Sequence, residues 1–449
     1  MKRQYFGTDG VRGPYGSPTM NENFAWRLGV AAARYTKAQP GLAGRPVFIG
    51  RDTRASGSAL EQALAAGLKS EGLRPISLGV VPTPVVSLLT RREPAALGVV
   101  ITASHNPASD NGIKFFGPAG IKLTDEQELQ IEQLIPASPP DRLPPTGPGE
   151  TLAEPLAHYL ALTTALLPAQ SLQGWKIVLD TANGAAAVSS RTALAQLGAS
   201  LTLLGDQPDG RNINDGVGSQ HTEKMCALVR TTGARLGIAH DGDADRCILC
   251  DETGQVLDGD EILTLLALHA LQQGRLAANT LVITQQSNLG VDAAVTAAGG
   301  RVCRTAVGDR YVIERMRAEG AMLGGESSGH VICAEISPTG DGLVAALKVI
   351  EVMLATGQPL SVLRRSLTKF PQLTAALTVK EKKPLESLPT LPAVIRAVEG
   401  EMGTAGRVMI RYSGTEPKLR LLVEGPTDAV VRASMDKLTA AVRADLVVL

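Results

Sequence analysis

A serine, a histidine and an asparagine stand together in Thr102-Ala-Ser-His-Asn-Pro107, directly after the apolar run Leu97–Ile101. The apolar run predicts a buried strand, and the carboxyl end of a strand is where open α/β sheets bind their ligands. Ser104 is therefore a candidate for chemistry on a bound ligand. A plain turn at Pro107 would give the same pattern, so the other polar stretches must decide between the two interpretations.

Three carboxylates alternate with small residues in Asp241-Gly-Asp-Ala-Asp-Arg246. Such a loop can fold its acids around one hard cation, which prefers oxygen ligands. An EF-hand fits less well, because Arg246 stands where that loop needs glycine and both flanks read as strands. A divalent-ion site is the favoured interpretation, and a solvated acidic turn is the alternative.

Three further stretches suit a sugar phosphate. Arg411-Tyr-Ser-Gly-Thr-Glu-Pro417, followed by Arg420, offers guanidinium groups, hydroxyls and a glycine-freed backbone to a phosphate oxyanion. A capped hairpin turn is the alternative there. Gly324-Gly-Glu-Ser-Ser-Gly-His330 supplies a carboxylate and hydroxyls that could hold sugar hydroxyls, and the glycine-rich Phe6-Gly-Thr-Asp-Gly-Val-Arg-Gly13 predicts a loop that faces phosphate.

The elements that carry these stretches alternate between strand and helix, which predicts right-handed βαβ units and an α/β fold. Strands are expected at 46–50, 74–80, 97–101, 114–117, 175–180, 235–239, 281–285 and 301–305, and on both sides of 411–417. Helices are expected at 22–38, 58–72, 124–134, 259–272, 289–298, 309–319 and 391–399, and from 427 onward. Six prolines between 136 and 148 mark a first boundary. We expect domains at 1–150, 151–250, 251–365 and 366–449.

Composition limits the partners and the compartment. Basic and acidic residues balance at 44 each, so no global field attracts nucleic acid or an anionic membrane. Aromatic residues are 3% of the chain, which argues against stacking platforms for single-stranded nucleic acid. With no signal-like N-terminus and no transmembrane-length stretch, we expect a soluble cytoplasmic protein. The five cysteines suit a reducing compartment, and Cys247-Ile-Leu-Cys250 is interpreted as core packing because no second pair accompanies it.

Taken together, these stretches resemble the α-D-phosphohexomutase superfamily in order and spacing over nearly the whole chain. The resemblance rests on a serine loop (102–107), a metal loop (241–246), a sugar loop (325–330) and a phosphate loop (411–417). The opening 6–13 and Val307-Gly-Asp-Arg-Tyr-Val312 resemble the bacterial branch that acts on glucosamine phosphates. Ser327 stands where that branch usually has glutamine, and Tyr412 where the phosphate loop usually has proline or alanine. Both are spacer positions and bear on fine specificity.

The resemblance implies three related α/β domains and a smaller α+β C-terminal domain around a central cleft. It implies that glucosamine 6-phosphate and glucosamine 1-phosphate are interconverted through a phosphoserine enzyme and glucosamine 1,6-bisphosphate, which is also a candidate primer. The product would enter UDP-N-acetylglucosamine and cell-wall precursor synthesis. The alternatives are a phosphomannomutase or phosphoglucomutase of the same superfamily, a serine-dependent sugar phosphatase, and a non-catalytic sugar-phosphate sensor. The expected partner is the small-molecule substrate, with no nucleic acid or membrane, and a homodimer is the candidate assembly.

The resemblance also assigns roles to single residues. Ser104 would carry the phosphoryl group and, with Asp241, Asp243 and Asp245, bind one Mg²⁺. Lys114 or His105 would transfer the proton, Lys114 being the family's choice, and Arg12 would join them. The residues expected to bind substrate are Glu326, Ser328, His330, Arg411, Ser413, Gly414, Thr415, Arg420 and Asp309. Asp309 would attract the amino group of the sugar, and the alternative is that it caps the helix that begins there.

Overall fold

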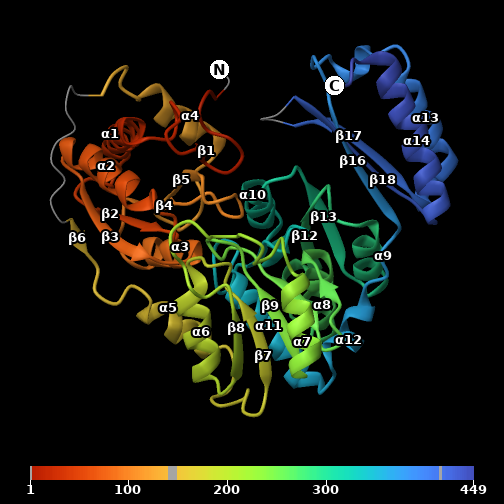
Figure 1. The fold of residues 1–449 in the computed structure, drawn as a ribbon, viewed down its shortest axis with the longest axis horizontal. Coiled ribbons are helices and arrows are strands. Elements are labelled where there is room, and N and C mark those ends of the chain that lie inside the picture. Colours follow the sequence, from red (N-terminus) through yellow and green to blue (C-terminus); the bar gives the residue numbers. More distant parts are fainter. Residues whose placement is uncertain (1–2, 140–148, 414–416) are drawn as a thin grey trace. The chain divides into compact units, whose positions relative to one another are not determined.

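The computed structural model describes residues 3–139, 149–413 and 417–449, which form two units (Figure 1). The first unit comprises Met1–Gln286 and Ala298–Ser366, and the second comprises Ser287–Ala297 and Leu367–Leu449. Among the described residues the first unit holds three sheets and the second holds one. Every strand predicted above lies in one of these sheets.

The first sheet has the strand order β1-β5-β4-β2-β3-β6. Its strands are β1 (Val11–Pro14), β2 (Pro46–Arg51), β3 (Arg74–Val80), β4 (Leu97–Ile101), β5 (Asp110–Phe116) and β6 (Glu150–Thr151). The accompanying helices are α1 (Glu22–Ala38), α2 (Gly57–Ser70), α3 (Thr83–Arg92) and α4 (Asp125–Gln133). β2 lies parallel to both β3 and β4, as βαβ units require. The capping box predicted for α4 is present, because Thr124 and Gln127 bond each other's backbone reciprocally.

One local expectation in this sheet was wrong. The sequence predicts a loop through residue 13, whereas Val11–Pro14 forms β1, antiparallel to β5 with Val11 opposite Ile113. Glycine and proline disfavour strands by propensity, but the partner strand and the burial of Val11, which is 1% exposed, override that preference here. Residues 6–10 remain a loop.

The second and third sheets repeat the α/β pattern, with strand orders β11-β10-β9-β7-β8 and β13-β12-β14-β15. The second contains β7 (Lys176–Asp180), β8 (Ser200–Leu204), β9 (Leu236–Ala239), β10 (Ile248–Asp251) and β11 (Val256–Leu257), with α5 (Ala157–Thr164), α6 (Ala186–Gln196) and α7 (Glu223–Thr232). The third contains β12 (Thr280–Thr284), β13 (Arg301–Thr305), β14 (Leu323–Gly325) and β15 (Val331–Cys333), with α8 (Gly259–Gln272), α10 (Asp309–Glu319), α11 (Gly342–Thr356) and α12 (Leu360–Leu363). Cys247 and Cys250 are free and buried beside or within β10, which confirms their packing role.

The second unit is a three-stranded antiparallel sheet with the order β16-β18-β17. Its elements are β16 (Gln372–Thr378), β17 (Arg407–Tyr412), β18 (Lys418–Glu424), α9 (Leu289–Ala297), α13 (Leu391–Met402) and α14 (Asp428–Asp445). α13 and α14 lie side by side along this sheet (Figure 1). Leu421 and Val423 of β18 and Leu438 of α14 share its buried apolar core. The predicted domain boundaries at 150, 250 and 365 stay predictions.

In the described part of the chain, no single helix has the length and apolar character needed to cross a membrane. α11 together with Leu360–Ser366, across a bend of 95°, matches such a segment by length and composition alone.

Candidate active site

Ser104 is held in a left-handed backbone conformation just beyond β4, with φ of 51° and 1% exposure. A non-glycine residue in this region costs of order 1 kcal/mol, so surrounding bonds must hold it there. The Ser104 hydroxyl donates to Asp241 Oδ2 at 2.5 Å, and the His105 ring lies at 3.2 Å from the same hydroxyl oxygen through Nδ1. The fold thus joins the predicted serine loop to the predicted metal loop.

The three acids of the metal loop converge between β9 and β10. One carboxylate oxygen from each of Asp241, Asp243 and Asp245 lies within 4.8 Å of the other two, and all three residues are buried. Asp243 Oδ2 accepts from Thr83, but Oδ1 of Asp243 and Oδ1 of Asp245 receive no hydrogen bond from any residue that the structure describes. Buried carboxylate oxygens left without donors are the ligands that a hard cation takes. The residues therefore fit a divalent ion.

Two of the three acids, Asp241 and Asp245, have pKa values shifted in opposite directions. Burial, and then the neighbouring Asp243 and Asp245, raise the pKa of Asp241 to about 8. Burial also raises the pKa of Asp245, but Lys114 and His330 outweigh it and hold that pKa well below its usual value. Of these two acids, Asp241, which accepts the Ser104 hydroxyl, is therefore the one whose ionised form a bound cation would stabilise more.

Lys114 is 1% exposed and lies among acids from two sheets. Its Nζ is 3.0 Å from Asp243 Oδ2, 3.1 Å from Asp9 Oδ2 and 3.6 Å from Asp245 Oδ2. Burial lowers the pKa of Lys114, but the three carboxylates raise it by a larger amount, so the net shift of the pKa is upward. Burial, followed by nearby arginines, lowers the pKa of His105 to about 4. Lys114 is thus a protonated ammonium group at neutral pH, and His105 is a neutral imidazole.

A series of ion pairs extends from Lys114 toward the third sheet. Asp9 forms ion pairs with Arg12 and Lys122, and Lys122 Nζ lies 2.5 Å from Asp309 Oδ2. His330 completes the chain, because its two ring nitrogens lie 3.5 Å from Asp245 and 3.6 Å from Asp309. Sequence reasoning missed Asp9 and Lys122, although both stand in or near stretches it had singled out.

His330 and Asp309 have defined electrostatic roles in this chain. Burial lowers the pKa of His330, but Asp245 and Asp309 outweigh it and raise the pKa to about 9. Asp309 is the first residue of α10, whose N-cap is Gly308 without any side-chain capping bond. Oδ1 of Asp309 nevertheless accepts the Arg310 N–H at 2.9 Å in the first turn of α10, which agrees with the helix-capping alternative, and its Oδ2 is paired with Lys122.

The sugar loop turns back on the segment that precedes α10. Glu326 Oε1 accepts the Gly308 N–H at 2.9 Å, and Ser328 donates its hydroxyl to Glu326 Oε2 at 3.3 Å. Both donors are neutral. Among the described residues no cation forms a hydrogen bond to the Glu326 carboxylate, but Arg246 and His330 interact with it electrostatically.

In the second unit, Arg411 of β17 stands directly opposite Arg420 of β18 in the antiparallel register. Like charges in this arrangement repel, and burial together with Arg420 lowers the pKa of Arg411. Lys382 Nζ donates to the Ser413 carbonyl at 2.6 Å and brings a further cation that the sequence pattern did not indicate. An anion between these groups would relieve the repulsion. The predicted residues Gly414 and Thr415 lie outside the described part of the chain.

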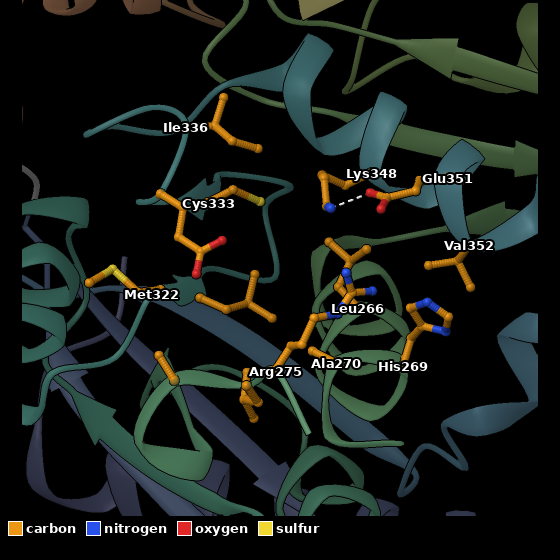
Figure 2. A pocket seen from close by; sticks show the side chains of 14 residues that line it. Leu266, His269, Ala270, Arg275, Met322, Cys333, Ile336, Lys348, Glu351 and Val352 are labelled. Carbon is orange, nitrogen blue, oxygen red and sulfur yellow. Dashed lines mark hydrogen bonds and ion pairs between the residues drawn. The ribbon is translucent and has the colours of Figure 1, made fainter. Parts of the chain in front are cut away.

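A pocket of about 130 Å³ lies between α8 and α11 (Figure 2). Figure 2 shows Leu266 and His269 of α8 facing Lys348 and Glu351 of α11, which form an ion pair with each other. Acids, bases and apolar side chains line it together, and none of the predicted site residues is among them. It is therefore distinct from the site around Ser104.

Comparisons with known proteins place this chain beside one family. Models of the phosphoglucomutase/phosphomannomutase family match in four parts, with α/β/α domains I, II and III at residues 3–140, 157–254 and 258–370 and the C-terminal domain at 375–441. Phosphoglucosamine mutase of Streptococcus thermophilus is 47% identical over 453 residues, covering 99% of both chains. That of Streptococcus pyogenes is 46% identical over 452 residues, again covering 99% of each. A phosphoglucomutase/phosphomannomutase family protein from Burkholderia thailandensis shares the fold, with a TM-score of 0.81, 24% identity and 100% coverage of both chains. The predicted fold class is confirmed.

Proposed function

Because this chain belongs to the phosphoglucomutase/phosphomannomutase family, we propose that it interconverts glucosamine 6-phosphate and glucosamine 1-phosphate. The full-length relatives named phosphoglucosamine mutase support this choice within the family. The observation that carries the chemistry is the buried Ser104 hydroxyl, bonded to an acid of the triad and placed in the serine loop. The enzyme is accordingly an isomerase that moves a phosphoryl group within its substrate.

Ser104 carries the phosphoryl group in the active enzyme. The substrate's free hydroxyl oxygen attacks that phosphorus, the bond to the Ser104 oxygen breaks, and glucosamine 1,6-bisphosphate forms. After the intermediate turns over, Ser104 attacks the other phosphate and releases the isomeric monophosphate. Asp241, Asp243 and Asp245, with an oxygen of the phosphorylated Ser104, would hold one Mg²⁺, which when bound offsets the negative charge on the transferring group.

Proton transfer falls to Lys114 in this proposal. When the bond between phosphorus and the serine or sugar oxygen breaks, a positioned acid can supply a proton to that oxygen. Lys114 is a buried titratable group beside the triad, and the acids around it keep it in the ammonium form, which is the acid that protonates the departing oxygen. His105, with a pKa of about 4, holds a proton poorly and contributes a neutral hydrogen-bond partner to Ser104.

Two groups of residues suit two different parts of the substrate. Glu326, Ser328 and His330 suit the sugar hydroxyls, and the paired Arg411 and Arg420 suit the phosphate that is not being transferred. Ser413, Gly414 and Thr415 join that phosphate site by resemblance. The amino group is cationic at neutral pH, and Glu326 is its favoured partner because Asp309 is already paired with Lys122.

The test is turnover and intact mass of the Ser104→Ala variant, with the exposed loop residue Ser109→Ala as the matched control. We expect Ser104→Ala to lose mutase turnover by several orders of magnitude and to take up no phosphoryl group, while the control keeps both. Near-normal isomerisation by Ser104→Ala would overturn the proposal. Release of inorganic phosphate without isomerisation by the wild type would favour the phosphatase alternative. A cytoplasmic location and a homodimer are part of this proposal and await a direct measurement.

A further inference from the structure

Arg54 is a buried arginine whose every N–H donor is used. It follows β2 and is 1% exposed, and its Nε donates to Asp52 Oδ2 at 2.9 Å. Its remaining four N–H groups donate to the serine loop and the start of β5. The acceptors are the backbone carbonyls of Ser104 (3.0 Å), Asn106 (2.8 Å), Pro107 and Asp110 (2.9 Å). Since a guanidinium has five N–H donors, no donor is left over.

Asp52, the ion-pair partner of Arg54, reaches the backbone N–H of Ser104 through the Thr102 side chain. Its Oδ2 also accepts the Thr102 hydroxyl at 2.6 Å, and Thr102 Oγ1 in turn accepts the Ser104 backbone N–H at 2.8 Å. The Ser104 N–H and carbonyl are therefore both fixed by one buried ion pair. The left-handed backbone of Ser104 requires such fixing, because most residues leave that conformation when free to do so.

The segment 52–55 also contacts the loops of the second sheet. Thr53 Oγ1 donates to the Asn183 carbonyl at 2.6 Å, and the Ala55 N–H donates to the Gly210 carbonyl at 2.9 Å. From the second sheet, Asn214 Nδ2 donates back to the Ser104 carbonyl at 2.9 Å. The strand β9 of that sheet leads to the metal loop. Residues 52–55 thus connect the serine loop to the domain that supplies its acids.

We propose that Arg54, held by Asp52, is a positioning residue for phosphoryl transfer, which keeps the Ser104 oxygen aligned with the metal loop. The inference rests on the proposed role of Ser104 as phosphoryl carrier. Arg54 acts through the backbone and does not contact the reacting atoms. An oxygen displaced from its line of attack reacts more slowly even when the substrate binds normally, and an error of about 1 Å can cost about 100-fold in rate.

A single phosphorylation of Ser104 has a rate and a final extent. Measuring both distinguishes a loss of positioning from a general loss of folded enzyme. Glucose 1,6-bisphosphate is mixed with dephosphorylated enzyme and Mg²⁺, and the added phosphoryl mass is followed with time. In this step the bond between the Ser104 oxygen and phosphorus forms, the bond from that phosphorus to the sugar oxygen breaks, and the serine proton ends on the released sugar hydroxyl. Positioning governs the rate, whereas loss of folded enzyme lowers the final extent.

Arg54→Lys keeps the charge beside Asp52 but cannot reach four carbonyls at once. We expect its phosphorylation rate to fall by about 100-fold, with a final extent close to one phosphoryl group per chain and an unchanged KM for the sugar phosphate. Arg51→Lys is the matched control, because Arg51 lies three residues away and pairs with Glu61 instead. It should phosphorylate at the wild-type rate.

Thr102→Val provides a second variant if Arg54→Lys does not fold. It preserves the shape of the side chain and removes the hydroxyl between Asp52 and Ser104, so the rate should again fall at full extent. A wild-type rate in either variant, or a reduced extent at the wild-type rate, would overturn the positioning role. If the wild type itself takes up no phosphoryl group, the proposed function fails instead, so the two failures are distinguishable.

Discussion

Replacing Asp241 by asparagine should stabilise the metal-free protein and remove its thermal response to Mg²⁺. Asp241 lies within 4.8 Å of two other carboxylates in a buried cluster. Without a cation, and above about pH 8 where Asp241 is ionised, the three negative charges repel one another, so the fold bears a cost that a bound ion would relieve. The amide keeps the size of the side chain and an oxygen that can accept the Ser104 hydroxyl.

The magnitude follows from the distances. Two charges 4.8 Å apart repel by about 3.5 kcal/mol at an effective dielectric constant of about 20, and the substitution removes two such pairs. It also removes the attraction of Arg246, whose Nε lies 3.9 Å from Asp241 Oδ2, worth about 4 kcal/mol on the same scale. The amide also loses one acceptor for the Arg246 N–H, which costs about 1 kcal/mol. The net stabilisation is about 2 kcal/mol above about pH 8, where Asp241 of the wild type is ionised, and it is smaller below that pH.

The pKa of Asp241 also predicts how the difference in stability between the variant and the wild type changes with pH. Because the pKa of Asp241 in the fold is raised to about 8, the folded metal-free protein binds a proton that the unfolded chain has already released. The stability from this group is present in acid and is lost as the pH rises toward 8. The unfolding midpoint of the variant should therefore exceed that of the wild type by an amount that grows between about pH 5 and about pH 8.

The assay is thermal unfolding of both proteins in chelator and in excess Mg²⁺, across that pH range. A stabilisation of about 2 kcal/mol corresponds to a few degrees in the midpoint for a protein of this size. In Mg²⁺ the wild type should gain stability by mass action, and the variant should not. A metal-free variant less stable than the wild type, or an equal Mg²⁺ response in both, would refute the electrostatic reasoning.

Three further predictions concern catalysis and binding. Chelation should abolish mutase turnover and Mg²⁺ restore it, with Asp243→Asn imitating the chelated enzyme; full activity in chelator would count against a metal role for the triad. Arg411→Ala should raise KM for the sugar phosphate by an amount corresponding to about 2 kcal/mol while Ser104 still takes up phosphate, and an unchanged KM would contradict the phosphate assignment. The ratio kcat/KM for glucosamine 1-phosphate should exceed that for glucose 1-phosphate and mannose 1-phosphate about tenfold. Glu326→Gln should reduce that preference more than Asp309→Asn does, and equal rates on the three sugars would overturn the amino-sugar assignment.

Local patterns in the chain determine much of this protein. The strand before Ser104, the alternating acids of the metal loop and the capping box at Thr124 depend on interactions between residues close together in the chain. Periodicity, capping and turn chemistry report such interactions directly. For this reason the α/β class could be predicted one stretch at a time, and the chemistry proposed for each loop could be proposed in the same way.

Only the tertiary structure determined which polar and charged side chains are in contact with one another. Ser104 and Asp241 are separated by 137 residues, and Lys114 and Asp243 by 129. No spacing rule connects residues so far apart, because their distance depends on how two separate sheets pack. Arg54 shows the limit most clearly, since an arginine after a strand ordinarily points to solvent. Its role emerges only where the fold brings four carbonyls of another loop around one guanidinium, a geometry that long-range packing creates and local sequence does not encode.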